Sequence, residues 1–406
     1  MQRFQQLFSC ALALCSSGLW HASVQAQAPF QEPEVVKIGF ITDMSSLYAD
    51  VEGRHGATAI QMAIDDFGGK VLGKPIELLT ADHQNKADIA AGKAREWIDQ
   101  QHISLVFGGT NSATALAMAA VATEKKRVFV DNGAGSSALT NEQCSPYVVH
   151  YAFDTVALAK GTGKAVVDNG GKRWFFLTAD YAFGHALEAD TTKIVQANGG
   201  TVVGAVKTPL NASDFSSFML QAQNSKAQIL GLANAGGDTV NSIKAAREFG
   251  ITKDMKLAGL LIFFSDIHSL GVRNTEGLQF TTSWYWDLND ASRQFADKFM
   301  EKTKRRPTEI QAADYSATWN YLQAVEQAGT LEADKVMAAW KSTELNDFFG
   351  KGRIRPDGRY AHDMYLMQVK SPAESKGVWD YYKLVKTLPA DEVWTTQAES
   401  RCQYWK

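Results

Sequence analysis

The chain has 406 residues, of which 45% are hydrophobic and 21% charged, and its formal net charge at pH 7 is -3. It carries no run of basic residues and no basic helical pattern, which argues against nucleic acid and anionic membrane surfaces as partners. A chain of this length and ordinary composition is typical of about two globular domains.

The first residues have the pattern of a secretory signal peptide. Arg3 precedes a mostly apolar stretch, Leu7–Leu19, and two small-x-small motifs then end at Ala26 and Ala28. We predict a signal peptide over residues 1–28, cleaved after Ala26 or Ala28. A membrane anchor is the weaker alternative, because the apolar stretch is shorter than the roughly 20 residues that span a bilayer.

Cleavage would remove Cys10 and Cys15 and leave Cys144 and Cys402. An even pair of cysteines in an exported protein suggests one disulfide, and two buried free thiols are the alternative.

Short apolar runs alternate with helical patterns from residue 35 onward. Strands are predicted at Val35–Ile41, Pro75–Thr80, Ile103–Phe107 and Arg127–Val130, and helices at Gly56–Phe67, Ala87–Gln100 and Ala113–Lys125. This alternation indicates βαβ units and a parallel sheet.

A second series of the same kind follows. Strands are predicted at Trp174–Thr178, Thr201–Val206, Gln228–Leu232 and Leu257–Phe263, and helices at Ala186–Asn198, Phe215–Asn224 and Thr239–Phe249. Two α/β lobes of roughly 120 residues each are therefore expected in tandem.

The remaining third is less regular. An extended aromatic segment is predicted at Gly277–Trp286, helices at Ala291–Thr303, Ile310–Ala328 and Ala333–Lys341, a turn between strands at Gly352–Arg359, and a strand at Tyr365–Lys370. The C-terminal tail is too aromatic for a disordered segment, so we expect it to pack across the body.

Motifs for catalysis are missing from the sequence. It holds no HExxH, no Walker A loop and no GxSxG, and its eight histidines show no metal-ligand spacing. We therefore predict that the protein is not an enzyme and that it has no catalytic residue, no bound metal and no cofactor. A secreted enzyme on a two-lobed fold remains the alternative from another class.

Polar loops follow several predicted strands, where open α/β sheets bind ligands. In the first lobe they are Asp43–Tyr48, Gly108–Ser112 and Asn132–Ser137, and in the second Thr178–Gly184 and Ala233–Asp238. The N–H groups and hydroxyls of the first lobe suit a carboxylate, although helix capping is an alternative use of the same residues. Aromatic residues at the second lobe and crossover, Tyr181, Phe183 and Trp286, suit an aromatic acid.

Several of these stretches match a known family. They are Ile38-Gly-Phe, Met44-Ser-Ser, Ala63-Ile-Asp, Val106-Phe-Gly-Gly and Ala186 to Asn198-Gly-Gly. The chain resembles the leucine/isoleucine/valine-binding type of periplasmic solute receptor over its whole mature length. Asp43-Met-Ser, Ala81–Lys86, Trp174–Gly184 and Leu232–Thr239 resemble the branch linked to aromatic acids such as benzoates and phenylpropanoids.

The resemblance implies an α/β type I periplasmic-binding fold, with two doubly wound parallel-sheet lobes joined by three crossovers. The crossovers are expected near residues 147–154, 281–286 and 354–363. Lobe 1 then comprises residues 29–148 and 283–356, and lobe 2 residues 149–282 and 357–406, with the C-terminal tail packing back towards the hinge. The resemblance also implies a monomeric periplasmic receptor that delivers its solute to the permease of an ABC importer. A ligand sensor without a transport role is an alternative, because its binding domain would show the same sequence pattern.

Site residues can be carried over by position. Asn111, Ser112, Gly135 and Ser136 fall where amino-acid-binding members hold the ligand carboxylate. Tyr48 and Phe183 fall near aromatic residues that cover the ligand, and Tyr181, Asn234 and Trp286 complete the predicted ligand-binding set.

The sequence departs from amino-acid-binding members at one position. Where they carry a carboxylate that pairs with the ligand's ammonium, this chain has Leu261 or an apolar neighbour. A buried ammonium without its partner is costly, which favours an aromatic acid. A receptor for branched-chain or other amino acids is the alternative, and it requires Asp266 or Asp238 as the counter-charge.

Overall fold

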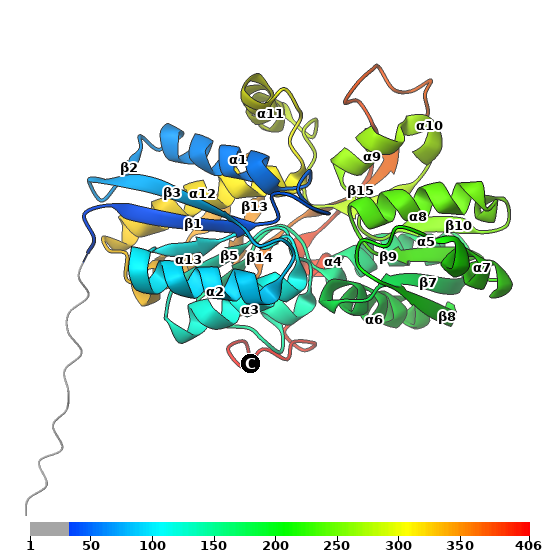
Figure 1. The fold of residues 1–406 in the computed structure, drawn as a ribbon, viewed down its shortest axis with the longest axis horizontal. Helices are drawn as coiled ribbons and strands as arrows, with labels where there is room; N and C mark the ends of the chain where they lie inside the picture. The colour runs from blue at the N-terminus through cyan, green and yellow to red at the C-terminus, as the bar shows by residue number, and fades with distance from the viewer. Residues whose placement is uncertain (1–31) are drawn as a thin grey trace, which may run out of the picture. The chain divides into compact units, whose positions relative to one another are not determined.

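The computed structural model describes residues 32–406, so the predicted signal peptide lies outside the described residues. Within residues 32–406, two mainly parallel sheets lie next to each other with helices on their faces (Figure 1). The predicted fold class is confirmed. No helix in this part of the chain is long and apolar enough to cross a membrane.

The first sheet has six strands in the order β2-β3-β1-β4-β5-β6. Its strands are β1 (Val36–Thr42), β2 (Lys70–Val71), β3 (Lys74–Asp82), β4 (Leu105–Phe107), β5 (Val128–Asp131) and β6 (Val148–His150). All pair in parallel except β2 with β3. β1 lies inside the sheet, and all its residues except Lys37 are buried. This explains its nearly continuous apolar sequence.

Helices cover both faces of the first sheet. They are α1 (Gly53–Asp66), α2 (Ala87–Glu96), α3 (Ser112–Glu124), α12 (Glu309–Ala328) and α13 (Ala333–Ser342), and α11 (Asp290–Thr303) also packs on α1. α1 and α12 lie on one face, and α2 and α3 lie on the other (Figure 1). Thr308 and Gln311 form a capping box at the start of α12, which explains why this long helix begins at Glu309.

The second sheet has four parallel strands in the order β10-β9-β7-β8. They are β7 (Arg173–Ala179), β8 (Thr201–Thr208), β9 (Ile229–Ala233) and β10 (Lys256–Gly259). The associated helices are α4 (Thr155–Leu158), α5 (Lys164–Asp168), α6 (Ala182–Ala197), α7 (Ser216–Asn224), α8 (Gly237–Glu248), α9 (Phe264–Leu270) and α10 (Val272–Thr275).

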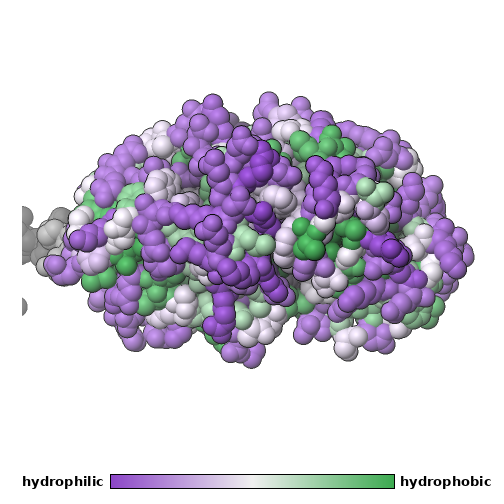
Figure 2. All heavy atoms as spheres, turned by 90° about the horizontal axis from the view of Figure 1, so that it is seen from above, coloured by the Kyte–Doolittle hydropathy of each residue, from purple (hydrophilic) through white to green (hydrophobic). Residues whose placement is uncertain are grey.

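Two small antiparallel sheets complete the described residues. One consists of β11 (Gln279–Thr282), β15 (Met364–Val369) and β16 (Tyr382–Leu388), and the other of β12 (Glu344–Asn346), β13 (Lys351–Ile354) and β14 (Tyr360–His362). The predicted turn between strands at 352–359 is confirmed by β13 and β14. Seen from above, the surface is largely polar with separate apolar patches (Figure 2).

One predicted strand and one predicted extended segment differ from the structure in extent. The run Leu257–Phe263 is predicted to be a strand throughout, but β10 ends at Gly259 and the apolar residues after it form a buried loop. The extended segment predicted at 277–286 is a strand only over β11. A short apolar run shows that a segment is buried, but it does not show that it pairs in a sheet.

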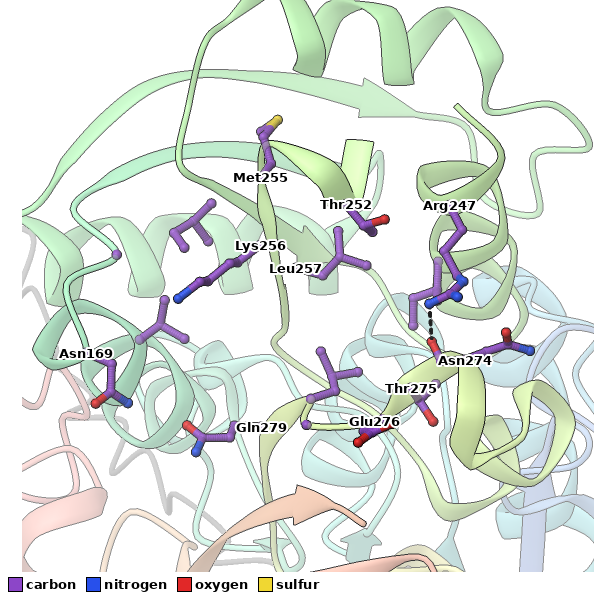
Figure 3. Close-up of a pocket in the computed structure, with 16 residues that line it drawn as sticks. Asn169, Arg247, Thr252, Met255, Lys256, Leu257, Asn274, Thr275, Glu276 and Gln279 are labelled. Atoms are coloured by element: carbon purple, nitrogen blue, oxygen red, sulfur yellow. Dashed lines mark hydrogen bonds between the residues drawn. The ribbon is translucent and has the colours of Figure 1, made fainter. Parts of the chain in front are cut away.

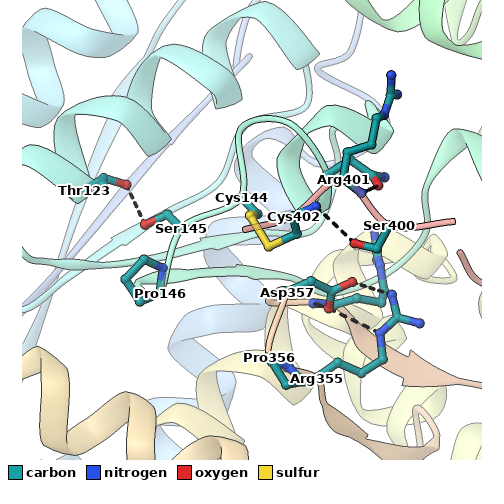
Figure 4. The surroundings of a disulfide bond; sticks show 12 residues. Thr123, Cys144, Ser145, Pro146, Arg355, Pro356, Asp357, Ser400, Arg401 and Cys402 are labelled. Atoms are coloured by element: carbon teal, nitrogen blue, oxygen red, sulfur yellow. Dashed lines mark hydrogen bonds and ion pairs between the residues drawn. A yellow bond between two sulfur atoms is a disulfide. The ribbon is translucent and has the colours of Figure 1, made fainter. Parts of the chain in front are cut away.

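The C-terminal tail packs on the body, as its aromatic content predicts. After β16, a short helix α14 (Ala390–Val393) leads to Trp394, which is 1% exposed and donates its indole N–H to the carbonyl of His362. A disulfide joins Cys144 and Cys402, as predicted, and thereby fixes the tail to the segment before β6 (Figure 4).

Candidate functional site

A small cavity lies where loops from the two main sheets face each other. It is lined by Tyr48, Val51, Thr110, Gly133, Tyr181, Phe183, Ala235, Leu261, Phe263 and Ile310. Most of these residues follow the carboxyl ends of strands in the two sheets, which is the usual place for a ligand in this class of fold. Its free volume is about 10 Å³, enough for about one water molecule. A larger solute therefore requires the facing loops to move apart.

Two tyrosines meet across this cavity. The hydroxyl oxygens of Tyr48 and Tyr181 are 2.6 Å apart, and Tyr48 is 2% exposed. The Asp43 carboxylate holds the Tyr48 loop by accepting the backbone N–H of Tyr48 at 2.8 Å. Burial, and then the neighbouring Tyr181, raise the pKa of Tyr48 well above its usual value, so its hydroxyl stays protonated.

Phe183 packs against a glycine of the facing loop. A Cβ at Gly135 would lie 2.7 Å from the Phe183 ring and 3.0 Å from the Phe153 ring. Only glycine allows this approach, so the structure places the predicted residues Gly135 and Phe183 in direct opposition.

The predicted carboxylate loops are largely engaged within the protein. The Asn111 side chain caps α3 by accepting the backbone N–H groups of Ala113 and Thr114. The Ser112 hydroxyl accepts the backbone N–H of Ser136 at 3.2 Å. The capping alternative therefore describes Asn111, whereas the hydroxyl hydrogens of Ser112 and Ser136 can still be donated.

Apolar residues form the opposite wall. Leu261 and Phe263 come from the buried loop after β10 and line the cavity. Asp266, a candidate counter-charge for an ammonium, instead accepts the backbone N–H of Phe263 at 2.9 Å. Burial raises the pKa of Asp266 to about 7.

Asp238 lies nearer to the tyrosine pair. It is in the first turn of α8, and its charge contributes to the raised pKa of both Tyr48 and Tyr181. One carboxylate oxygen accepts the backbone N–H of Asn211, while the other has no hydrogen-bond partner within residues 32–406. Burial raises the pKa of Asp238 to about 6.

Of the nine predicted site residues, only Tyr48, Tyr181 and Phe183 are among those that line the cavity. Asn111, Ser112, Gly135 and Ser136 belong to the loops that contribute Thr110 and Gly133, and Asn234 and Trp286 lie elsewhere. The Asn234 side chain is buried and bonds to the hydroxyls of Ser242 and Thr239 within its own segment. Trp286 donates its indole N–H to the carbonyl of Trp379 and stacks on the Arg306 guanidinium. The structure does not bring either residue to the cavity wall.

Sequence reasoning missed part of the lining. Thr110 and Gly133 lie inside the predicted loops, but other members of those loops are the predicted site residues. Val51 and Ile310 precede and begin helices distant in the chain, and no local pattern marks them as neighbours. Only the topology of the fold could find them, because α12 packs directly on α1.

A larger cavity, of about 510 Å³, lies at the other end of the second sheet (Figure 3). It is bordered by the starts of β9, β10 and β11, including Ile229, Lys256 and Gln279. Many of its polar side chains, such as Lys256 and Arg247, are exposed. The amino ends of parallel strands are not the usual ligand position, so the small cavity is the better candidate. Within residues 32–406 no group of three or more His, Cys, Asp or Glu side chains is placed to hold a metal ion.

Comparison with known families agrees with this geometry. The family model for periplasmic binding proteins matches residues 35–377. The chain belongs to this family. Its members are solute-binding proteins and not enzymes, and in ABC transporters they deliver small molecules to a permease.

Individual relatives extend the comparison. A periplasmic binding protein of Burkholderia mallei is 64% identical, with 92% of this chain and 100% of that chain covered and a TM-score of 0.91. A branched chain amino acid ABC transporter ligand-binding protein of Burkholderia xenovorans is 38% identical, with coverages of 91% and 100% and a TM-score of 0.82. The Leu/Ile/Val-binding protein homolog 6 of Brucella melitensis is 26% identical over 86% of this chain and 90% of that protein.

A more distant structure shares the fold alone. It is a solute-binding protein of an ABC transporter from Rhodopseudomonas palustris, solved with 3,4-dihydroxybenzoic acid. It is 24% identical, covers 88% of this chain and 98% of its own, and has a TM-score of 0.80. Together these matches confirm the predicted type I fold and the ABC-transporter solute-binding class.

Proposed function

We propose that this periplasmic receptor binds a small aromatic carboxylate, of the benzoate or phenylpropanoid kind, in the cavity at Tyr48 and Phe183. The observation that carries the proposal is the chemistry of the wall. Every residue that lines the cavity is uncharged, and most are aromatic or aliphatic. An aromatic ring gains from burial among such side chains, whereas an ammonium without a counter-charge pays a desolvation cost.

The carboxylate would bind at the polar side of the same cavity. Thr110 lines it, and the hydroxyls of Ser112 and Ser136 lie on the adjoining turns, each with a hydrogen left to donate. Hydrogen bonds to a charged group contribute roughly 1.5–3 kcal/mol each. The solved Rhodopseudomonas palustris neighbour with a dihydroxybenzoic acid supports this ligand class by analogy of fold.

The second candidate is a branched-chain amino acid. The 38% identical Burkholderia xenovorans protein, a branched chain amino acid ABC transporter ligand-binding protein, favours it. The Asp238 carboxylate beside the tyrosine pair, one oxygen of which has no hydrogen-bond partner within residues 32–406, also favours it. In this alternative Asp238 must reach the ammonium, although it is not part of the cavity lining.

Calorimetry with benzoate, benzamide and leucine separates the two. We expect benzoate to bind in the micromolar range, and its neutral amide to bind about tenfold to a hundredfold more weakly through loss of a charged hydrogen bond. Ser112→Ala should weaken benzoate but not change the weak binding of benzamide. Micromolar binding of leucine without binding of benzoate would establish the amino-acid alternative.

A further inference from the structure

A chain of hydrogen-bonding groups runs from the cavity wall into a buried acidic pair. The hydroxyl oxygens of Thr110 and Thr42 are 3.2 Å apart, and either can donate. The Thr42 hydroxyl also contacts a carboxylate oxygen of Glu52 in a short hydrogen bond. Thr110 lines the cavity, whereas Thr42 and Glu52 are fully buried behind it. The wall is thus connected through two hydroxyls to a carboxyl group.

Glu52 does not serve the helix that it precedes. It is the N-cap residue of α1, but its side chain makes no capping hydrogen bond. It turns instead towards Asp314 of α12, because a Cβ at Gly56 would lie 2.9 Å from Glu52 Cγ and 2.5 Å from an Asp314 carboxylate oxygen. Glu52 Oε1 and this Asp314 oxygen have no other hydrogen-bond partner within residues 32–406. Two carboxylates in contact cannot both be ionised at moderate pH, so the pair must hold a proton.

The surroundings of Asp314 fix the pair in place. Asn132 donates its side-chain N–H to Asp314 at 2.8 Å, and a Cβ at Gly56 would lie 2.5 Å from the other Asp314 oxygen. Asn132 is followed by Gly133, which lines the cavity. The chain of contacts therefore begins at the cavity wall and returns to it.

Other charged groups around the pair add negative charge or lie one contact further away. The charge of Asp43, from the loop after β1, raises the pKa of Glu52, and the charge of Asp131, at the end of β5, raises the pKa of Asp314. Asp131 in turn faces His150 at 3.3 Å and the Arg359 guanidinium. Burial is the largest cause of both shifts. It raises the pKa of Glu52 to about 7 and the pKa of Asp314 well above its usual value.

We propose that Thr110, Thr42 and Glu52 form a hydroxyl relay that sets the hydrogen-bond polarity of the cavity wall, so that an anionic solute binds together with a proton. When Glu52 is protonated it donates to Thr42, Thr42 donates to Thr110, and Thr110 donates into the cavity. When Glu52 is ionised, Thr42 donates to Glu52 and Thr110 donates to Thr42. Thr110 then presents only lone pairs to the solute.

The proposal makes Glu52 and Thr42 positioning residues for the solute carboxylate. It rests on the proposed function, because coupling between proton uptake by Glu52 and solute binding requires an anionic solute. An ionised Glu52 also repels that solute by its charge, which acts in the same direction as the reversal of the hydroxyls. Both effects weaken anion binding as the pH rises through about 7.

Calorimetric titration with benzoate from pH 6 to pH 9, in two buffers of different ionisation enthalpy, tests the relay. Benzoate stays ionised over this range, so changes report on the protein. We expect roughly tenfold weaker binding at pH 9 than at pH 6, which is the size of the interaction with one partly screened charge. A tenfold change corresponds to proton uptake that peaks at about half a proton near pH 7.5. Thr42→Val should remove the part that the hydroxyls carry and leave only the direct charge effect of Glu52, so the pH dependence and the proton uptake should both become smaller. Thr42→Ser should retain both in full.

Binding of benzoate without proton uptake and with a constant Kd would overturn the relay while leaving the proposed function intact. A Thr42→Val variant with the full pH dependence would also overturn it. Absence of benzoate binding at every pH would instead contradict the proposed ligand class. Urea unfolding without added solute then tests separately whether Glu52 holds a proton in the folded protein. Glu52→Gln should flatten the loss of stability between pH 5 and pH 8 relative to wild type, whereas Glu301→Gln, at an exposed position away from the relay, should not.

Discussion

The hydroxyl oxygens of Tyr48 and Tyr181 are 2.6 Å apart, and this hydrogen bond joins the loop after β1 to the start of α6. Both side chains line the cavity, so the bond forms between the two sides that must separate to admit a solute. Two-lobed binding proteins open and close by hinge motion around their ligands. If the solute binds in this cavity, as proposed, the tyrosine pair contributes to the free-energy difference between the closed and open arrangements.

Tyr181→Phe should shift the molecule towards the open arrangement. The variant loses one hydrogen bond and leaves the buried Tyr48 hydroxyl without its partner, which costs about 1 kcal/mol and changes the closed-to-open ratio about fivefold. Small-angle scattering without added solute should give a larger radius of gyration than wild type. Tyr315→Phe removes a hydroxyl that bonds to Asp66 away from the cavity, and should leave the radius unchanged. Equal radii for Tyr181→Phe and wild type would show that the pair does not hold the lobes together.

Gly135→Ala should hinder closure from the other side of the cavity. The new methyl group would overlap the Phe183 ring, so the loop after β5 and the start of α6 could not approach as they do in the structure. We expect benzoate binding about tenfold weaker, with a loss of at most about 1–3 kcal/mol in unfolding free energy. Gly92→Ala is the matched control, because nothing lies within 4 Å of the added Cβ. Unchanged affinity in Gly135→Ala would argue against this contact in the bound form.

Asn111 can be assigned to capping or to ligand binding by two substitutions. Asn111→Ala removes the cap of α3 and should lower the unfolding free energy by about 1 kcal/mol. Asn111→Asp keeps an acceptor at the helix start and should preserve stability, since a negative charge is favourable there. If the solute carboxylate binds beside Ser112, the Asn111→Asp variant should repel it and weaken benzoate binding by about tenfold or more. Wild-type affinity in Asn111→Asp would place the carboxylate elsewhere.

The fold could be predicted because it rests on local patterns repeated along the chain. The alternation of strands such as 103–107 with helices such as 113–125 marks a parallel α/β sheet before any contact is known. The strand prediction failed for the buried loop Leu260–Phe263, because hydrophobicity reports burial and not pairing. The apolar wall that this loop forms could still be predicted from the same residues, since Leu261 and Phe263 do line the cavity.

The candidate site was less accessible to sequence reasoning. Strand ends identified the loops that line the small cavity, but which side chain of a loop faces the cavity depends on its hydrogen bonds. Asn111 turns back to cap α3, whereas Thr110 beside it lines the wall. Contacts over long sequence separations, such as Glu52 with Asp314, leave no local signature. They arise only when α1 and α12 pack together.

Removing the disulfide should destabilise the protein and release the tail. Cys144 and Cys402 are separated by 258 positions, and a cross-link over such a loop stabilises by about 5 kcal/mol at most in the chain-entropy model. The double variant Cys144→Ser/Cys402→Ser should unfold at lower urea concentration. Hydrogen exchange near Trp405, which stacks on Arg355, should become faster. Solute affinity should change little, and a large loss of affinity would show that the tail acts on the cavity.

Glu309 should make stability depend on pH in a direction unlike that of surface carboxylates. It is 3% exposed, and burial, followed by the charge of Asp266, raises its pKa from 4.5 to about 8. Between these values the folded protein holds the proton and the unfolded chain releases it, so the unfolded state binds fewer protons and stability falls as the pH rises. The contribution is fully present below about pH 4.5 and is lost as the pH rises through about 8.

Urea unfolding at pH 5, 6.5, 8 and 9 measures this contribution. Wild type should lose up to a few kcal/mol of unfolding free energy from Glu309 across the range, since each pKa unit corresponds to about 1.4 kcal/mol. Glu309→Gln keeps the shape and a neutral side chain, so its stability should fall less steeply with pH and exceed that of wild type at pH 9. The exposed Glu301→Gln should follow the wild-type curve. If Glu309→Gln instead became less stable relative to wild type as the pH rose, the Glu309 carboxyl would have to be ionised in the folded protein. An ionised Glu309 would need a partner for its Oε1 atom, which has no hydrogen-bond partner within residues 32–406.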